Sequence, residues 1–235
     1  MKAAVIDPSE AGPVLDAVKK SGATLESIWN THHHPDHVGG NKKLVEHFPN
    51  LGVYGSEKDK GKIPCQTHFL KDSDVIEVGG MSARVISNPG HTHGAISYYA
   101  GNQVLFTGDT LFGAGCGRLF EGSPKDMQES FDKLFSLPKN TQVYCGHEYT
   151  GANLKFASAV EPNNLDIAQR QKSTLGSTHK VNCSVPFLLG DEKKTNPFAR
   201  TDQPDVIKAV SNHFNSTFNS PDEVFGALRK WKDGF

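Results

Sequence analysis

The pattern of hydrophobic and polar positions alternates between strand-like and helix-like segments over the first 150 residues. Apolar residues three or four positions apart predict helices that begin at Pro13, after Asp36 and at Ser123-Pro124. Short apolar runs bounded by turn-forming residues predict strands at 2–7, 25–30, 53–55, 75–78, 81–87, 96–100, 103–106 and 142–145. The dipeptides Gly79-Gly80 and Gly101-Asn102 each separate two of these strands, as hairpin turns do. The alternation predicts a sheet-rich α/β domain over residues 1–150.

Helical periodicity dominates after Tyr149. Helices are predicted at 152–160, 163–178, 204–213 and 221–231, with Pro162 and a loop over 190–197 between them. We expect residues 151–235 to form a second, smaller helical domain. The alternative is that these helices pack onto a single larger domain.

Composition narrows the class of protein. A chain of 235 residues with 36% apolar content can bury a sizeable core. It has no apolar run of the roughly 18 residues that a membrane span needs. The net charge of −1, without a long basic stretch, argues against a nucleic-acid partner. The four cysteines form no Cys-x-x-Cys pair, and Met1-Lys2 opens no signal-peptide pattern. We therefore expect a cytoplasmic monomer, with a mitochondrial form as the alternative.

The segment 31–40, Thr-His-His-His-Pro-Asp-His-Val-Gly-Gly, concentrates metal-binding side chains. His32 and His34 are two residues apart, so in extended backbone both side chains point to the same side and can bind one ion. Asp36 and His37 follow where the chain turns towards a helix, and they can face a second ion. Imidazole and carboxylate suit Zn²⁺, Fe²⁺ and Mn²⁺. A solvated His run or a tag remnant is the alternative, but a tag would lie at a terminus.

Three later strands each end close to a further candidate ligand. His91 follows Pro89-Gly90, Asp109 follows Gly108, and His147 follows Gly146. Gly108 allows the backbone to approach a neighbour closely. His93 is a second candidate beside His91, and Asp109 could also be an ordinary turn residue.

Together these motifs resemble those of glyoxalase II, the hydroxyacylglutathione hydrolase family of the metallo-β-lactamase superfamily. The resemblance covers almost the whole chain, in the order expected of the family. Its carriers are 32–37, Pro89-Gly90-His91-Thr92, 106–112, 115–118, Tyr144-Cys145-Gly146-His147-Glu148-Tyr149-Thr150, Asn196-Pro197-Phe198 and 229–233.

The resemblance implies a metallo-β-lactamase-like αββα sandwich followed by a small helical domain. It implies two divalent ions, Zn²⁺ foremost, with Fe or Mn as alternatives. The implied ligands are His32, His34 and His91 on the first ion, Asp36, His37 and His147 on the second, and Asp109 between them. Asp36 and Asp109 are the implied catalytic carboxylates. A metal-bridging hydroxide is the expected nucleophile, and the chain contains no Gly-x-Ser-x-Gly elbow that would supply a serine.

The implied reaction is hydrolysis of S-D-lactoylglutathione and related 2-hydroxyacyl glutathione thioesters. A thiolate leaves easily, so a site without a dedicated acid is adequate for this substrate. Substrate contacts are implied for Arg118, Phe120, Tyr149, Arg229 and Lys232. Phe120 stands where many members have Tyr. Arg229 and Lys232 share a helix face, and a solvated basic helix end is their alternative interpretation.

Two other interpretations remain open from the sequence. One is a superfamily relative, such as a persulfide dioxygenase with one iron or a lactonase. The other is an inactive, shortened paralogue, because the family usually begins with a further strand pair ahead of the segment that opens this sequence. Missing strands would expose a sheet edge.

Overall fold

The computed structural model describes residues 1–101, 103–175 and 183–235. These residues form two compact units. Unit 1 comprises Met1–Ser87 and Thr92–Gly108, and unit 2 comprises Asn88–His91 and Asp109–Phe235. Each unit has its own helices and its own cluster of buried apolar residues.

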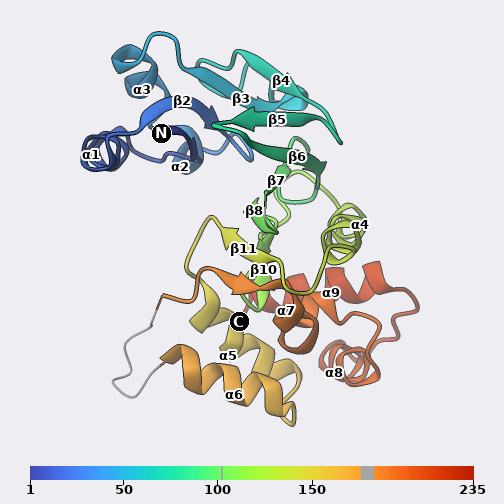
Figure 1. The fold of residues 1–235 in the computed structure, drawn as a ribbon. Coiled ribbons are helices and arrows are strands. Elements are labelled where there is room, and N and C mark those ends of the chain that lie inside the picture. Colours follow the sequence, from blue (N-terminus) through green and yellow to red (C-terminus); the bar gives the residue numbers. More distant parts are fainter. Residues whose placement is uncertain (102, 176–182) are drawn as a thin grey trace. The chain divides into compact units, whose positions relative to one another are not determined.

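Unit 1 contains a parallel sheet in the order β1-β2-β3-β4. Its strands are β1 (Lys2–Ile6), β2 (Thr24–Trp29), β3 (Gly52–Ser56) and β4 (His68–Leu70). Helices α1 (Ala11–Ser21) and α3 (Asn41–His47) bury their apolar faces against one side of this sheet, in a cluster that includes Leu25, Ile28, Leu44 and Val53 (Figure 1). Because the strands are parallel, their carboxyl ends deliver Asp7 and the His-rich segment to the same edge.

The other side of this parallel sheet packs against an antiparallel layer within unit 1. Strands β5 (Val75–Val78), β6 (Met81–Ser87), β7 (Ile96–Ala100) and β8 (Val104–Gly108) are successive antiparallel neighbours. Trp29 of β2 and Tyr98 of β7 meet in the shared core, with ring centroids 5.3 Å apart. Unit 1 therefore has a helix–sheet–sheet layering, as expected for the metallo-β-lactamase type of sandwich.

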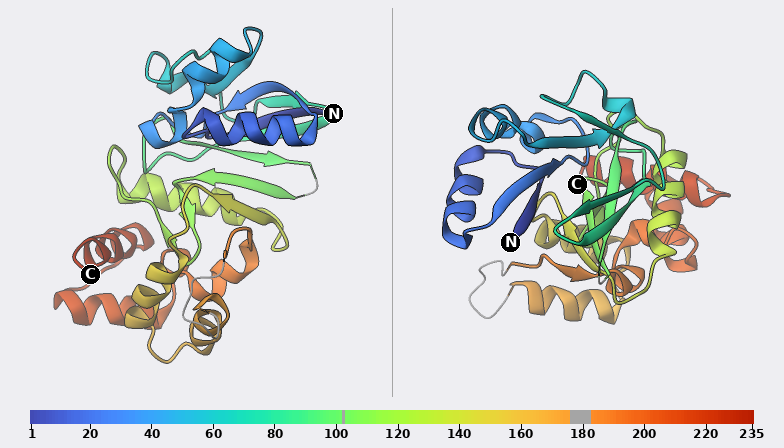
Figure 2. Two further views of the ribbon diagram at one scale, coloured as in Figure 1. Left: turned by 90° about the vertical axis from the view of Figure 1, so that its left-hand side faces the viewer. Right: turned by 45° about the horizontal axis from the view of Figure 1, so that its top comes forward.

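Unit 2 is mainly helical (Figure 2), and aromatic side chains form much of its core. Phe198 is fully buried between Phe156 and Phe225, and Phe225 also meets Phe131 edge-on. The elements are β9 (Leu111–Phe112), β10 (Gly115–Cys116), α4 (Pro124–Phe135), β11 (Gln142–Cys145), α5 (Thr150–Val160), α6 (Leu165–Leu175), β12 (Phe187–Leu188), α7 (Leu189–Thr195), α8 (Pro204–Phe214) and α9 (Pro221–Asp233). Ser123 caps α4 in a capping box with Asp126.

Several predicted boundaries were wrong. Helix α1 begins at Ala11, two residues before Pro13, because the first turn of a helix tolerates a proline. The segment expected as a loop over 56–67 contains a 3₁₀ turn, Glu57–Asp59, and the loop expected over 190–197 is largely helix α7. The short strands β4, β9, β10 and β12 were not predicted. Asn102 of the second hairpin turn and residues 176–178 of the predicted 163–178 helix lie outside the described residues.

Among the described residues, no helix combines the length and apolar character needed to cross a membrane. The four cysteines all lie in the described part of the chain, and all are free thiols.

Candidate metal centre

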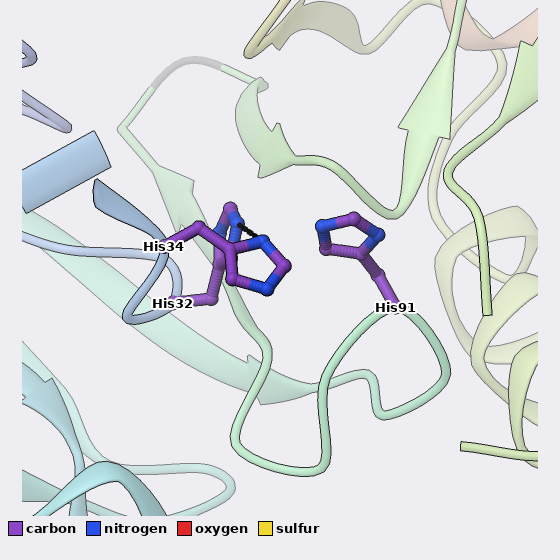
Figure 3. A group of neighbouring side chains, drawn as sticks. All are labelled: His32, His34 and His91. Atoms are coloured by element: carbon purple, nitrogen blue, oxygen red, sulfur yellow. Dashed lines mark hydrogen bonds between the residues drawn. The ribbon is translucent and has the colours of Figure 1, made fainter. Parts of the chain in front are cut away.

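The His-rich segment lies in unit 1, between the end of β2 and the short helix α2 (Pro35–Val38). His32 Nε2 and His34 Nδ1 lie 3.1 Å apart (Figure 3). This convergence agrees with the prediction that residues two apart in extended backbone point to the same side. His32 and His37 are buried, whereas the side chain of Asp36 is 57% exposed and lies 3.8 Å from His37.

Asp7, at the end of β1, holds this segment in place. Its Oδ1 accepts a hydrogen bond from the Thr31 backbone N–H at 2.7 Å, and its Oδ2 accepts one from the Thr31 hydroxyl at 2.6 Å. The same Oδ2 lies 3.0 Å from His37 Nδ1. Asp7, His32 and His37 each offer an atom within 4.8 Å of the others. Asp7 has a φ of +46°, a left-handed conformation that Asp tolerates better than most residues.

A second buried carboxylate supports the middle histidine of the segment. Asp59 is fully buried, and its Oδ1 lies 2.9 Å from His33 Nδ1. The His33 ring in turn meets the His34 ring edge-on, with centroids 5.2 Å apart. Asp59 therefore anchors the segment from a different element than Asp7 does.

Unit 2 brings the three later candidate ligands together. Asp109 Oδ2 lies 3.6 Å from His91 Nε2 and 3.3 Å from His147 Nε2. His91 and Asp109 are buried, and His147 is about one-quarter exposed. A carboxylate flanked by two imidazoles is the arrangement expected of a bridging ligand. His93, the alternative to His91, is exposed and belongs to unit 1.

Two glycines allow the close backbone approaches near these ligands. Gly108 has a φ of +49°, and a Cβ there would collide with the side chain of Thr31 within unit 1. In unit 2, a Cβ on Gly117 would collide with the backbone oxygen of Asp109 and approach His91 Nδ1 to 2.9 Å. The sequence predicted the first approach at Gly108 but not the second.

Hydrogen bonds fix the tautomers of three of the histidines. The Thr31 hydroxyl donates to Asp7, so it accepts from His32 Nδ1–H at 3.0 Å. His37 Nδ1–H donates to the Asp7 carboxylate, and His91 Nδ1–H donates to the Arg118 carbonyl at 2.8 Å. In all three rings Nε2 is then the nitrogen with the lone pair.

This donor set fits divalent metal ions. Protein ligands to such ions typically present one imidazole nitrogen and donate the other N–H to a carboxylate, carbonyl or hydroxyl. His32, His37 and His91 all follow that pattern, and Asp36 and Asp109 add carboxylate oxygens. Each unit thus carries a half-site with the chemistry of a Zn²⁺, Fe²⁺ or Mn²⁺ ligand set.

The predicted substrate-contacting residues all lie in unit 2. Phe120 and Tyr149 are 62% and 49% exposed, and they lie against His91 and His147 with ring centroids 5.3 Å and 4.9 Å apart. Arg118 is also exposed. Large exposed aromatics beside candidate ligands are well placed to meet a substrate.

The two basic residues at the end of α9 differ in exposure and environment. Arg229 is buried and donates from Nη1 to the Cys116 carbonyl at 3.0 Å. Lys232 contacts Asn153 Oδ1, and desolvation together with the nearby Arg229 charge lowers the pKa of Lys232 to about 8. Burial raises the pKa of the Cys116 thiol, which suits a packing role rather than a nucleophilic one.

Sequence reasoning missed Asp7, Asp59 and Thr31 as supports of the site. The only local signal for Asp7 was its position before Pro8 at the end of a predicted strand. Nothing local marked Asp59, since its partner is 26 residues away along the chain.

Comparisons with known proteins point to one family. Residues 1–147 match the metallo-beta-lactamase superfamily, and residues 148–235 match the C-terminus of hydroxyacylglutathione hydrolase. A "Hydroxyacylglutathione hydrolase" from Crocosphaera subtropica is 48% identical over 239 residues, which cover 99% of this chain and 91% of the relative.

Solved structures of the same fold resemble the chain more distantly. The crystal structure of ETHE1 from Myxococcus xanthus is 26% identical, with a TM-score of 0.65, and the match covers 98% of this chain and 88% of that one. TTHA1623 in a di-iron-bound form is 27% identical, with a TM-score of 0.59, and the match covers 82% of this chain and 87% of that one.

Proposed function

Because the chain belongs to the hydroxyacylglutathione hydrolase family of the metallo-β-lactamase superfamily, we propose that it hydrolyses S-D-lactoylglutathione and related 2-hydroxyacyl glutathione thioesters. The products are glutathione and the free hydroxy acid, and the reaction would complete methylglyoxal detoxification. The observation that carries the proposal is the pair of half-sites, each of which joins imidazoles and carboxylate in the pattern of metal ligands.

The proposed ligand set combines the two half-sites. His32, His34 and His91 would hold one ion, Asp36, His37 and His147 would hold the other, and Asp109 would offer its carboxylate to both. Two observations support this assignment: the hydrogen bonds that present Nε2 of His32, His37 and His91, and the position of Asp109 between His91 and His147. Zn²⁺ is the proposed metal, and Fe or Mn fit the same donors.

When bound, the ions polarise the thioester carbonyl and lower the pKa of water, so that water can act as the nucleophile near neutral pH. The residues of the chain hold the arrangement in which this happens. Asp7 fixes the ring of His37 and the Thr31 backbone, and the Arg118 carbonyl fixes the ring of His91. Asp36 and Asp109 are the proposed catalytic carboxylates, and they would act through the ions that they help to hold.

The leaving group of the proposed reaction, a thiolate, needs no proton donor from the protein. A thiolate with a reference pKa near 8.5 departs without a dedicated acid. Phe120 and Tyr149 offer apolar surface beside His91 and His147, where the thioester would pass. Arg118, Arg229 and Lys232 supply positive charge for the carboxylate of the glutathione glycine. Residues 151–235 thus act as the substrate-binding domain in this proposal, and residues 1–150 act as the catalytic domain.

We also propose that the chain acts as a monomer in the reducing cytoplasm. The free state of all four cysteines supports a reducing compartment. Size-exclusion chromatography with light scattering would test the oligomeric state.

The test of the activity is hydrolysis of S-D-lactoylglutathione by the purified chain, measured as release of thiol. We expect turnover that disappears on chelation and returns with Zn²⁺. The matched control is the Asp109→Asn variant, whose shape is preserved but whose carboxylate charge is lost. Absence of turnover in the metal-loaded wild type, or full activity of the Asp109→Asn variant, would refute the proposal.

A further inference from the structure

The last turn of α9 places a carboxylate among three basic side chains of unit 2. Asp233 Oδ1 accepts hydrogen bonds from Arg229 Nε at 3.2 Å and from Arg229 Nη2 at 2.8 Å. The same oxygen lies 3.7 Å from Arg118 Nε. Lys232 precedes it in the chain, and the charge of Asp233 favours the protonated form of Lys232. One acidic side chain therefore acts on all three basic residues proposed to bind the substrate carboxylate.

The position of Asp233 runs against the electrostatics of its own helix. It is the last residue of α9, where the helix dipole favours positive charge and disfavours a carboxylate. Lys230 and Lys232 in the same turn follow the rule. The unfavourable interaction of Asp233 with the helix dipole needs compensation, and the positive charges of Arg118 and Arg229 supply it.

Arg229 has limited freedom to rearrange around this carboxylate. Its side chain is only 7% exposed, and its Nη1 donates to the backbone carbonyl of Cys116 at 3.0 Å. The Nε–Nη2 edge is the side of a guanidinium that a carboxylate can engage with two parallel hydrogen bonds. In this structure Asp233 occupies that edge through a single oxygen. A carboxylate from a ligand would have to compete with Asp233 for the same donors.

We infer that Asp233 is an internal counter-ion that limits the affinity of the Arg118–Arg229–Lys232 cluster for the carboxylate of a bound glutathione moiety. The inference rests on the proposed function. The thioester substrate and the glutathione product carry the same glycine carboxylate, so a cluster without Asp233 would retain the product as well as the substrate. Asp233 therefore lowers the affinity for both substrate and product, and the weaker binding of glutathione favours its release.

The experiment compares the wild type with the Asp233→Asn and Asp233→Ala variants. Titration calorimetry measures the Kd of glutathione. Steady-state assays measure the KM of S-D-lactoylglutathione and the inhibition constant of glutathione as a product. We expect all three constants to fall by about threefold in both variants, the size expected for loss of a partly exposed ion pair. Asp16→Asn, which removes one exposed carboxylate from α1, controls for net charge and should change none of them.

An amidated substrate identifies the group that competes with Asp233. The D-lactoyl thioester of glutathione whose glycine carboxylate is converted to a carboxamide lacks this negative charge, so its KM should be the same in the wild type and in both Asp233 variants. Unchanged or weaker glutathione binding in the folded variants would overturn the inference, and so would an equal shift in KM for the amidated thioester. Failure of the wild type to hydrolyse any glutathione thioester would refute the proposed function instead, while calorimetry with glutathione would still test Asp233.

Discussion

The two half-sites present similar chemistry but are built in different ways. In unit 1 the candidate ligands lie within one segment, residues 32–37, and the carboxylates of Asp7 and Asp59 anchor it. In unit 2 His91, Asp109 and His147 come from three separate segments, and Asp109 Oδ2 lies within 3.6 Å of both imidazoles. The first half-site depends on supports behind the ligands, whereas the second depends on the fold that brings distant segments together.

This difference predicts where substitutions should act. Changing a support in unit 1 should loosen metal binding without removing a ligand. Changing Asp109 in unit 2 should remove the group between two imidazoles, and no neighbour in its own segment can replace it.

Asp109→Asn should have the largest effect on catalysis. The amide keeps the shape of the side chain but loses the negative charge between His91 and His147. We expect kcat/KM for the thioester to fall by roughly 1000-fold, equivalent to several kcal/mol of transition-state stabilisation. Thermal melts of the metal-free proteins provide the control, since the two should unfold at similar temperatures. Retention of more than a tenth of the activity would contradict a bridging role.

Asp7→Asn tests the supports of unit 1. The Thr31 hydroxyl and His37 Nδ1–H both donate to the Asp7 carboxylate. An asparagine offers one oxygen acceptor instead of two, and its NH₂ group cannot accept a hydrogen bond from either donor. We expect metal affinity to fall by about 10- to 100-fold, the usual effect of losing a hydrogen-bond partner of a ligand. Competition with a chromophoric chelator measures the affinity, and Asp16→Asn is the charge-matched control. Unchanged affinity would show that Asp7 does not orient His37 in the metal-bound protein.

His33→Ala and His34→Ala separate support from ligation within the same segment. His33 pairs with the fully buried Asp59, so its loss leaves that carboxylate with one partner fewer. We expect His33→Ala to lower the free energy of unfolding by about 1–3 kcal/mol. Chemical denaturation of the metal-free protein measures this change.

His34→Ala should show the opposite pattern. Both side chains are partly buried, but His33 pairs with the buried Asp59 carboxylate whereas His34 Nδ1 faces His32 Nε2, so the metal-free protein should lose less stability in His34→Ala than in His33→Ala. The His34→Ala variant should, however, bind fewer metal ions. The same response from both variants in both measurements would remove the distinction between support and ligand.

The smallest effect is a pH dependence from Lys232, whose pKa is lowered to about 8. The side chain is charged below that pH and neutral above it, so the KM for the glutathione thioester should rise several-fold between pH 7 and pH 9. Lys232→Met should have a higher KM at pH 7 and lose this dependence. A thioester without the glycine carboxylate serves as the control. An identical pH profile in the wild type and Lys232→Met would contradict the assignment.

The same pKa shift predicts that stability increases with pH, although the affinity for the substrate decreases. Between about pH 8 and the ordinary lysine value of 10.5, the unfolded chain holds a proton on Lys232 that the folded chain has lost. The contribution of Lys232 to the free energy of unfolding therefore rises with pH across this window. Denaturation of the wild type and Lys232→Met at several pH values measures it.

The sequence predicted the parts of the molecule that depend on local pattern. His32 and His34 converge as their spacing predicted, and the strands of unit 1 were largely placed from their apolar runs. Helix α7 was missed because its polar segment, Leu189–Thr195, contains a glycine and lacks a strong apolar period. Asp7 and Asp59 were missed because their partners lie more than 20 residues away in the sequence. Such contacts are fixed by the packing of parallel strands, which no local pattern records.

We propose that the two half-sites together form a dinuclear metal centre that hydrolyses glutathione thioesters. The decisive measurement titrates metal-free protein with Zn²⁺ and follows bound metal and hydrolysis of S-D-lactoylglutathione on the same sample. Turnover should rise until about two ions are bound per chain and then stay constant. Saturation of activity at a single ion, or two bound ions without turnover, would contradict it.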